Sequence, residues 1–262
     1  MRNARYAEYD ATPRPVVAIA NEFKAGHILP PHRHDRAQLV YGAAGMMMVE
    51  TEQGRWVVPQ GRAVWIPGGM RHNLRMLSDV ATITIWVESE RELPAVCQVV
   101  DVSPLMRSLL AAAIDVEPKY DRNGRDGVLM TLLVHEMARL PTLPLSLSFP
   151  AHARLAERCR AFLNNPSPHD TIEDWSDALG MSRRTFTRLF KNETGLSFAA
   201  WRQQACLLAA LPRLAANEPI TQISLDLGYE SPAAFTAMFK RLQGVPPSQY
   251  FGRYGSAGQA LA

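Results

Sequence analysis

Three histidines and one glutamine in the first third of the chain have the side chains best suited to binding chemistry. His32 and His34 are two residues apart on a segment expected to be extended, so both imidazole rings face the same side. Gln38 follows four residues later, and His72 can join them from a neighbouring strand. Three converging imidazoles are a typical site for a divalent metal, with Gln38 as a weak fourth ligand. Without a metal, the same groups would form a polar pocket that binds an organic ligand, or would bond to one another.

A second set of candidates lies on one face of a predicted helix. Phe186, Leu189 and Phe190 recur at helical spacing and form its apolar side. The opposite side, within an arc of about 140° at 3.6 residues per turn, carries Arg183, Arg184, Thr187, Arg188 and Lys191. Such a face suits a polyanion, and arginine can donate two hydrogen bonds to a guanine edge. Taken alone, the same pattern also fits a solvated basic surface.

The basic helix belongs to a unit that occurs twice between Thr171 and Tyr250. Each copy has a helix pattern, a glycine turn and a second helix pattern, and the turn glycines Gly180 and Gly228 are 48 residues apart. This is the plan of a helix-turn-helix unit. The outward face of the second copy carries Ala233, Thr236, Ala237 and Lys240. Because small apolar side chains discriminate poorly between bases, we expect the first copy to make most of the base contacts.

A longer helical pattern, from Ser197 to about Leu214, joins the two copies. Its length of roughly 27 Å, at 1.5 Å per residue, approaches the roughly 34 Å of one DNA turn. Such a spacer would place both second helices in successive major grooves on one face of a duplex. Pro212 is expected to kink or end this helix.

Two motifs in these units resemble the AraC/XylS family of transcriptional regulators. The motifs are Gly180-Met181-Ser182-Arg183-Arg184-Thr185-Phe186 and Leu227-Gly228-Tyr229-Glu230-Ser231-Pro232, completed by Phe235, Phe239, Gly244 and Pro247. The resemblance covers about Ala151 to Tyr254. It implies a seven-helix DNA-binding domain with two helix-turn-helix units, and Ser231 joins the expected DNA contacts. Cys206 stands where the family often has arginine, which removes a candidate contact to the DNA backbone.

Residues 16–100 carry strand patterns instead of helical ones. The predicted strands are Val16–Ile19, Gln38–Tyr41, Met46–Val49, Arg55–Val58, Ala63–Ile66, Ala81–Val87 and Val96–Val100. Glycine, proline, asparagine and aspartate separate them at short intervals. Many short strands at this spacing indicate a sandwich or a barrel.

The glycines and histidines of this region resemble the two cupin motifs. The first set is Gly26, His32, His34, Gln38 and Gly45, and the second is Gly61, Pro67, Gly69 and His72. The resemblance implies a small double-stranded β-barrel with its site in the centre. The chain departs from the pattern at Gln38, where the motif has glutamate, and at Met76, where asparagine is expected.

The remaining segments divide the chain. The pattern of residues 103–140 predicts two helices, which either pack on the barrel or contact a second copy of the protein. Such helices commonly carry dimer contacts in the AraC family, so the resemblance implies a homodimer. Residues 141–150 contain three prolines and predict a semi-extended linker. The expected fold is α+β and multidomain: a cupin-like domain with flanking helices over 1–140, a linker over 141–151, an all-α DNA-binding domain over 152–254, and a disordered tail over 255–262.

Composition and charge support this division. The 262 residues have a net charge of +3. Residues 1–150 hold 16 basic and 16 acidic side chains, and residues 151–262 hold 12 and 9, so the excess lies on the repeated units. The three cysteines are far apart, which disfavours a disulfide framework or zinc finger. The chain has no signal-peptide core and no apolar run long enough to span a membrane, so we expect a cytoplasmic protein.

These features predict a sequence-specific DNA-binding transcriptional regulator, not an enzyme, whose cupin-like domain senses a small molecule or metal ion. Binding there would alter DNA binding or contacts with RNA polymerase. The alternative is a metal-dependent cupin enzyme, dioxygenase-like, fused to a DNA-binding domain. A ligand-binding module without DNA function would leave the repeat and the basic face unexplained.

Overall fold

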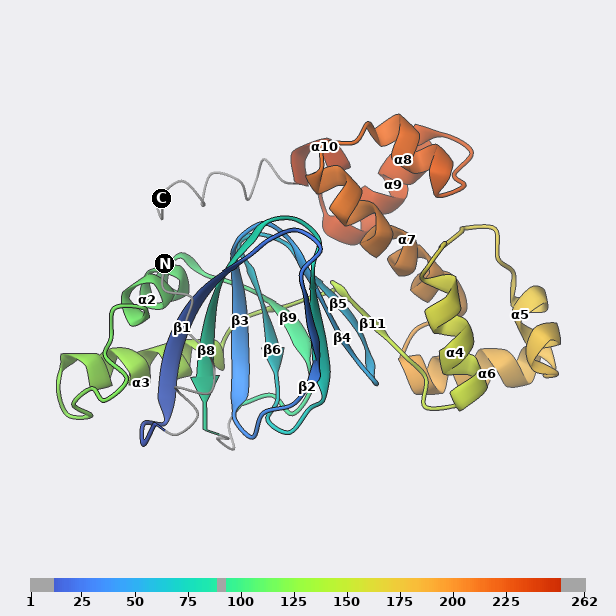
Figure 1. The fold of residues 1–262 in the computed structure, drawn as a ribbon. Helices are drawn as coiled ribbons and strands as arrows, with labels where there is room; N and C mark the ends of the chain where they lie inside the picture. Colours follow the sequence, from blue (N-terminus) through green and yellow to red (C-terminus); the bar gives the residue numbers. More distant parts are fainter. Residues whose placement is uncertain (1–11, 89–92, 251–262) are drawn as a thin grey trace. The chain divides into compact units, whose positions relative to one another are not determined.

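The computed structural model describes residues 12–88 and 93–250, and its contacts divide the chain into two units (Figure 1). Among the described residues, the first unit contains 12–51, 56–88 and 93–144. The second unit contains 145–250 and also residues 52–55, which are the two residues after β4 and the first two residues of β5.

The first unit is a β-barrel built from two antiparallel sheets, followed by two helices. Its elements are β1 (Val16–Phe23), β2 (Ile28–His32), β3 (Ala37–Ala44), β4 (Met47–Thr51), β5 (Gly54–Val58), β6 (Arg62–Ile66), β7 (His72–Met76), β8 (Val80–Val87), β9 (Gln98–Asp101), α2 (Pro104–Ala113), α3 (Arg125–Met137) and β10 (Thr142–Leu143). One sheet has the order β1-β8-β3-β6-β9-β10, and the other contains β5-β4-β7-β2 in that order; the short strand β11 (Ser146–Ser148) belongs to the second unit. The cupin-like barrel predicted from the sequence is confirmed.

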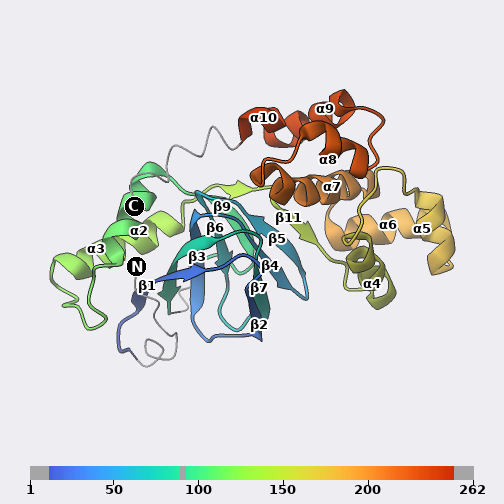
Figure 2. The same cartoon turned by 45° about the horizontal axis from the view of Figure 1, so that its top comes forward.

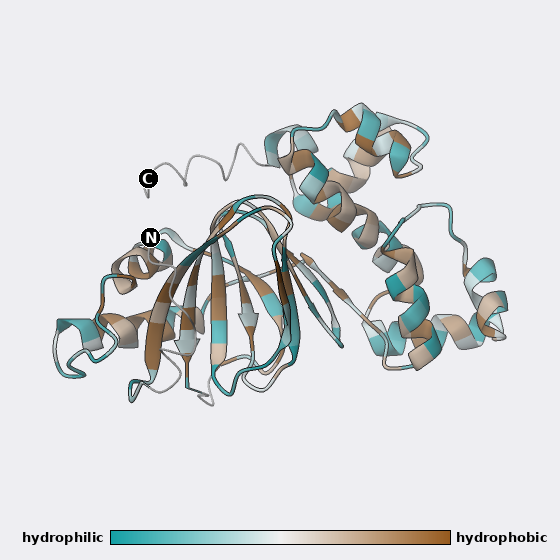
Figure 3. Cartoon of the chain, in the orientation of Figure 1, coloured by the Kyte–Doolittle hydropathy of each residue, from teal (hydrophilic) through white to brown (hydrophobic). Residues whose placement is uncertain are grey.

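Alternation along the central strands gives the six-stranded sheet two different faces. Ile83 and Ile85 of β8 join a buried cluster with side chains of α2 and α3, while Thr82, Thr84 and Trp86 line the barrel interior. Figures 1 and 2 show α2 and α3 on the outer side of this sheet. Apolar residues accordingly recur along its strands in Figure 3. The interior face is therefore free to carry polar side chains without weakening the main core.

The helices α2 and α3 pack on the barrel of their own chain, which was one of the two predicted alternatives. Met106 and Leu110 of α2 and Leu133 of α3 have 0% exposure. The helix α3 begins at Arg125, so Gly127 lies in its first turn. Gly127 is needed there because an added Cβ would lie 2.0 Å from the carbonyl oxygen of Arg122.

The second unit is helical within the described residues. It contains α4 (Ala153–Phe162), α5 (Ile172–Leu179), α6 (Arg183–Thr194), α7 (Phe198–Ala215), α8 (Ile220–Asp226), α9 (Pro232–Gln243) and α10 (Pro247–Tyr250). These are the seven helices that the resemblance implied. Gly180 and Gly228 adopt the left-handed backbone expected of turn glycines, with φ of 66° and 81°. The predicted tail, residues 255–262, lies outside the described residues.

Aromatic side chains hold each helix-turn-helix unit together. In the first, Trp175 of α5 lies between Phe186 and Phe190 of α6 and Phe198 of α7, with ring centroids 4.8–6.3 Å apart. In the second, Phe239 contacts Phe235 and Tyr250. The regular spacing of phenylalanines in the sequence therefore marks the inner faces of α6 and α9.

Two local predictions concern prolines. Pro212 does not end α7 at its own position, because the helix continues to Ala215; this proline stands in the last turn and disturbs few of the helix's hydrogen bonds. The predicted linker contains the division between the two units, after Pro144; in it β10 pairs with β9, and residues 145–149 alternate buried and less buried side chains. Within the second unit, the carbonyls of Ser146 and Ser148 accept hydrogen bonds from Gln204 and Trp201 of α7.

Candidate functional site

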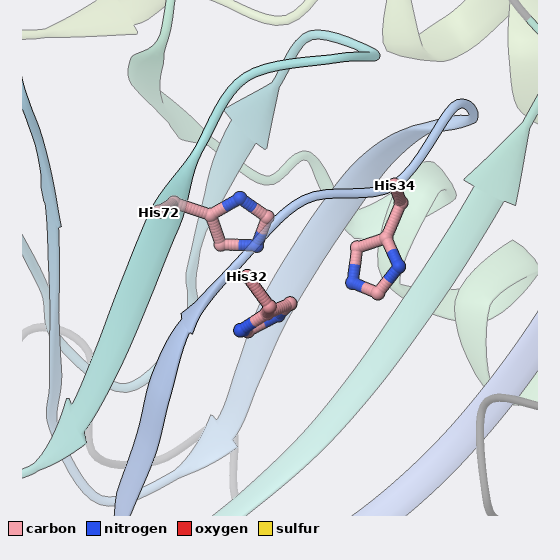
Figure 4. Close-up of side chains that lie close together, drawn as sticks. All are labelled: His32, His34 and His72. Carbon is pink, nitrogen blue, oxygen red and sulfur yellow. The ribbon is translucent and has the colours of Figure 1, made fainter.

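The three predicted histidines come together inside the barrel (Figure 4). His32 ends β2, His72 begins β7, and the two are direct partners across the strand pair. His34 reaches the same place from the segment after β2. One ligand nitrogen from each ring can be chosen so that all three lie within 4.8 Å of one another. The prediction that His72 joins His32 and His34 therefore matches the geometry.

Backbone carbonyls orient two of these rings. The Nδ1–H of His32 donates to the carbonyl of Pro30 at 2.6 Å, and the Nδ1–H of His72 donates to the carbonyl of Met70 at 2.8 Å. Because a carbonyl only accepts, each neutral ring keeps its lone pair on Nε2. Metal-binding histidines usually donate their other ring N–H to a carbonyl or carboxylate in this way, which fixes the tautomer.

His72 is the most enclosed member of the cluster. Burial lowers the pKa of His72 to about 4, which keeps its ring neutral near pH 7. The hydrogen bond to the Met70 carbonyl raises this pKa, and the nearby His32 lowers it further. A neutral ring with a fixed acceptor nitrogen is the form that binds a metal ion or accepts a proton from a ligand.

Gln38 supplies the present partner of His72. Its side chain extends from β3 and its Nε2 lies 2.6 Å from the Nε2 of His72, both side chains being buried. Since His72 Nε2 is the acceptor, the amide N–H of Gln38 donates. The predicted fourth member of the site therefore touches the cluster, as a hydrogen-bond donor.

The cluster opens into a cavity of about 380 Å³ inside the barrel. The cavity is lined by Asn21, Phe23, Leu29, Pro30, His32, His34, Gln38, Val40, Leu74, Thr82, Thr84 and Trp86. Its volume is in the range of pockets for small organic molecules. Trp86 packs edge-on against His34, with ring centroids 4.4 Å apart. Asn21, Thr82, Thr84 and Trp86 were not predicted as site residues; strand alternation, which puts the last three on one face, could have indicated them.

The candidate DNA-contacting residues lie on the outer faces of α6 and α9. The exposed ones are Arg183, Arg184, Thr187, Arg188, Lys191, Ala233, Ala237 and Lys240. Ser231 and Thr236 are half-buried, and the Ser231 hydroxyl caps α9 by accepting from the Ala234 N–H. Cys206 is fully buried, so its thiol is away from the surface.

Arg183 differs from the other basic residues of α6. Its Nη1 lies 2.6 Å from the Oε1 of Glu173 on α5. Sequence reasoning missed this partner, because the two residues lie on different helices of the unit. The ion pair directs the Arg183 guanidinium toward α5 and leaves Arg184 and Arg188 as the better candidates for base contacts.

Comparison with known proteins identifies both units. A cupin domain model matches residues 21–88, and a helix-turn-helix domain model matches residues 175–253. The HTH-type transcriptional regulator NimR of Escherichia coli is 30% identical over 225 residues, covering 86% of this chain and 82% of NimR. The arabinose operon regulatory protein of Salmonella typhimurium is 25% identical over 140 residues, 51% of this chain and 47% of that protein. This chain belongs to the AraC/XylS family of transcriptional regulators.

A solved structure of ToxT from Vibrio cholerae also aligns with this AraC/XylS-type regulator. It covers 91% of this chain and 98% of its own, at 10% identity and a TM-score of 0.37. In the regulator described here, the helix-turn-helix match contains both α6 and α9, and the cupin match contains the whole histidine cluster. None of the helices in the described part of the chain has the length and apolar character to cross a membrane.

Proposed function

We propose that this regulator is a one-component sensor: α6 and α9 bind a specific DNA site, and the cupin domain senses a small molecule or metal ion at His32, His34, Gln38 and His72. The observation that carries the proposal is the oriented imidazole cluster at the mouth of the barrel cavity. Backbone carbonyls hold the rings of His32 and His72 with their Nε2 lone pairs available, and Gln38 now bonds to His72. A bound ligand would replace this last hydrogen bond with its own contacts to the cluster.

The cluster suits a divalent transition metal. Neutral imidazole nitrogens favour zinc, copper, nickel or iron(II). Ligand nitrogens around a tetrahedral zinc lie about 3–3.5 Å apart, given Zn–N bonds of about 2.0–2.1 Å. The chosen nitrogens of the three rings lie within 4.8 Å of one another, so they would have to approach by up to about 1.5 Å to hold such an ion. Gln38 can contribute its amide oxygen by turning the amide over. A bound metal would add positive charge and an open position for a ligand.

In this proposal, α6 makes more hydrogen bonds to DNA than α9 does. Arg184, Thr187, Arg188 and Lys191 of α6 supply most donors, and Lys240 with the small side chains Ala233, Thr236 and Ala237 of α9 supply fewer. Arg183 and Ser231 contribute at the edges of these faces, since one is paired with Glu173 and the other caps α9. We infer that ligand binding changes DNA affinity or contacts with RNA polymerase.

The test compares reporter induction with DNA affinity in cluster variants. His34→Ala and His72→Gln should abolish induction by the effector or metal and leave the DNA-binding unit folded. His135→Ala, an exposed histidine on α3, is the matched control and should respond normally. Normal induction in both cluster variants would show that the histidine cluster is not the sensing site. Oxygen consumption by the iron(II)-loaded protein with candidate substrates would instead favour the enzyme alternative.

We further propose that the protein acts in the cytoplasm as a homodimer. The outer sides of α2 and α3 carry the large apolar side chains Leu105, Val128 and Leu132, which are 41–63% exposed. A second copy would cover such side chains and join two DNA-binding units, which raises affinity through effective concentration. Sedimentation of the wild type and of Val128→Asp with Leu132→Asp measures this directly; a wild-type monomer would contradict it.

A further inference from the structure

The cavity next to the histidine cluster has neutral walls. Among residues 12–88 and 93–250, its lining includes aromatic, aliphatic, hydroxyl, amide and imidazole side chains, and no aspartate, glutamate, lysine or arginine. The acidic side chains nearest in sequence do not change this. Glu22 alternates with the lining residues Asn21 and Phe23 on β1, so it points to the other side of the strand. Asp35, next to His34, is exposed.

Neutral walls have a consequence for the proposed metal site. Three imidazoles and one carboxamide contribute no negative charge, so they leave the full positive charge of a divalent ion uncompensated in a partly buried place. An unbalanced charge in such surroundings is strongly disfavoured. Gln38 occupies the position at which a glutamate would provide one negative charge. The missing charge must therefore come from outside the chain.

The shape of the cavity sets the form of that partner. Gln38 of β3 pairs with Trp86 of β8, next to the histidines. Thr82 is four residues from Trp86 on β8, so the two residues are about 13 Å apart at 3.3 Å per residue. Thr82 in turn pairs with Asn21 of β1. Apolar walls, including Phe23 and Leu74, lie between the two ends. At about 30 Å³ per water-sized group, the cavity has room for roughly a dozen non-hydrogen atoms.

We propose that the cavity binds a small organic monoanion together with a divalent cation at His32, His34 and His72, each raising the affinity for the other. The acidic group, a carboxylate or its equivalent, lies at the histidine end and balances the charge that Gln38 does not balance. The apolar body fills the middle, and a small polar substituent can reach Thr82 and Asn21. This inference rests on the proposed sensing function and names the chemical class of its ligand.

The test is calorimetry on the full chain with zinc, cobalt(II) and nickel, and with benzoate, cinnamate and octanoate. Each acid is titrated into chelator-treated and metal-loaded protein, and benzamide and cinnamamide serve as neutral controls. At least one acid should bind tenfold or more tightly when metal is present. Linkage requires the same acid to raise metal affinity by the same factor. The visible spectrum of the cobalt(II) protein should change on adding the acid and not on adding the amide.

Gln38→Glu tests the charge argument directly. The new carboxylate supplies the negative charge from within the chain, so metal affinity without acid should rise at least tenfold. The factor by which the acid raises metal affinity should then fall to about one. Gln98→Glu is the matched control, because it adds the same charge on β9, outside the cavity lining, and should leave both affinities unchanged.

The outcomes separate this inference from the proposed function. Metal binding that depends on His34, with no acid coupling or with equal coupling to the neutral amides, would overturn the anion proposal and leave metal sensing intact. Tight acid binding without metal would also overturn it. Failure of all metals to bind, with normal induction in the His34→Ala variant, would overturn both.

Discussion

Replacing Arg184 by alanine should weaken specific DNA binding more than replacing Arg183 on α6 or Lys240 on α9. Arg184 is exposed on the outer face of α6, while its neighbour Arg183 is paired with Glu173 at 2.6 Å. An arginine that contacts a base edge with two hydrogen bonds contributes about 1–3 kcal/mol of discrimination. At 1.4 kcal/mol per factor of ten, this corresponds to a loss of about 5- to 150-fold in affinity for the cognate site.

Two further variants separate a base contact from simple charge. Arg184→Lys keeps the positive charge and loses the planar fork, so it should lose most of the specificity and keep the salt dependence. Lys240→Ala on α9 should weaken binding to cognate and scrambled DNA alike. If it removes one phosphate contact, it should reduce the slope of log affinity against log salt by about 0.9.

The assay is a DNA-shift or anisotropy titration on the upstream region of the protein's own gene and on a scrambled sequence, at several salt concentrations. Circular dichroism confirms that each variant is folded. The ratio of cognate to scrambled affinity is the deciding quantity. If Arg184→Ala and Lys240→Ala reduce this ratio equally, the ranking of the two helices is wrong.

Three other predictions follow from particular contacts. Arg183→Ala should cost less cognate affinity than Arg184→Ala, because its guanidinium is held by Glu173; a larger loss in the same titration would assign base contact to Arg183. A fragment of residues 145–262 should melt at a higher temperature than a fragment of residues 151–262. The shorter fragment lacks the Ser148 carbonyl that accepts from the buried Trp201, which should lower its free energy of unfolding by about 1–3 kcal/mol. Equal melting temperatures would contradict this prediction. Because the pKa of His72 is lowered to about 4, its neutral ring stabilises the metal-free fold fully above about pH 6.5, and up to about 3 kcal/mol is lost as the pH falls to 4. Denaturant unfolding of wild type and His72→Asn should show a smaller decline in the variant, and parallel curves would refute the assignment.

The barrel was predictable from the strands that have clear runs of apolar residues, and less so from the strands that lack such runs. All seven strands predicted from apolar runs are present, but β2 and β7, which carry His32 and His72, were not among those runs. The segment of β2 contains Pro30 and Pro31, and proline is tolerated at the edge of a sheet, where β2 lies. The β7 segment alternates buried His72, Leu74 and Met76 with less buried residues, but it is short and polar at its start. The cupin spacing, and not strand propensity, located these two strands.

The candidate site was predictable in its residues and not in its contacts. His32, His34, Gln38 and His72 are adjacent in the barrel, as the motif implied. The cavity wall depends on the register of β8 beside β1 and β3, which pairs Trp86 with Gln38 and Thr82 with Asn21. Pairing between strands far apart in the sequence is set by the whole sheet, so local patterns could not supply it. The same limit applies to the ion pair of Arg183 with Glu173.

The neutral amide at position 38 suits a sensor better than a permanent metal site. A ligand shifts an equilibrium only by the difference in its affinity for the two states. A carboxylate at this position would favour the occupied state with or without a signal, and the difference would be small. Gln38 instead bonds to His72, so a metal or ligand would have to replace this hydrogen bond. Under the proposed sensing function, occupancy would depend on what enters the cavity, and the interaction energy of that ligand would become available to change DNA binding.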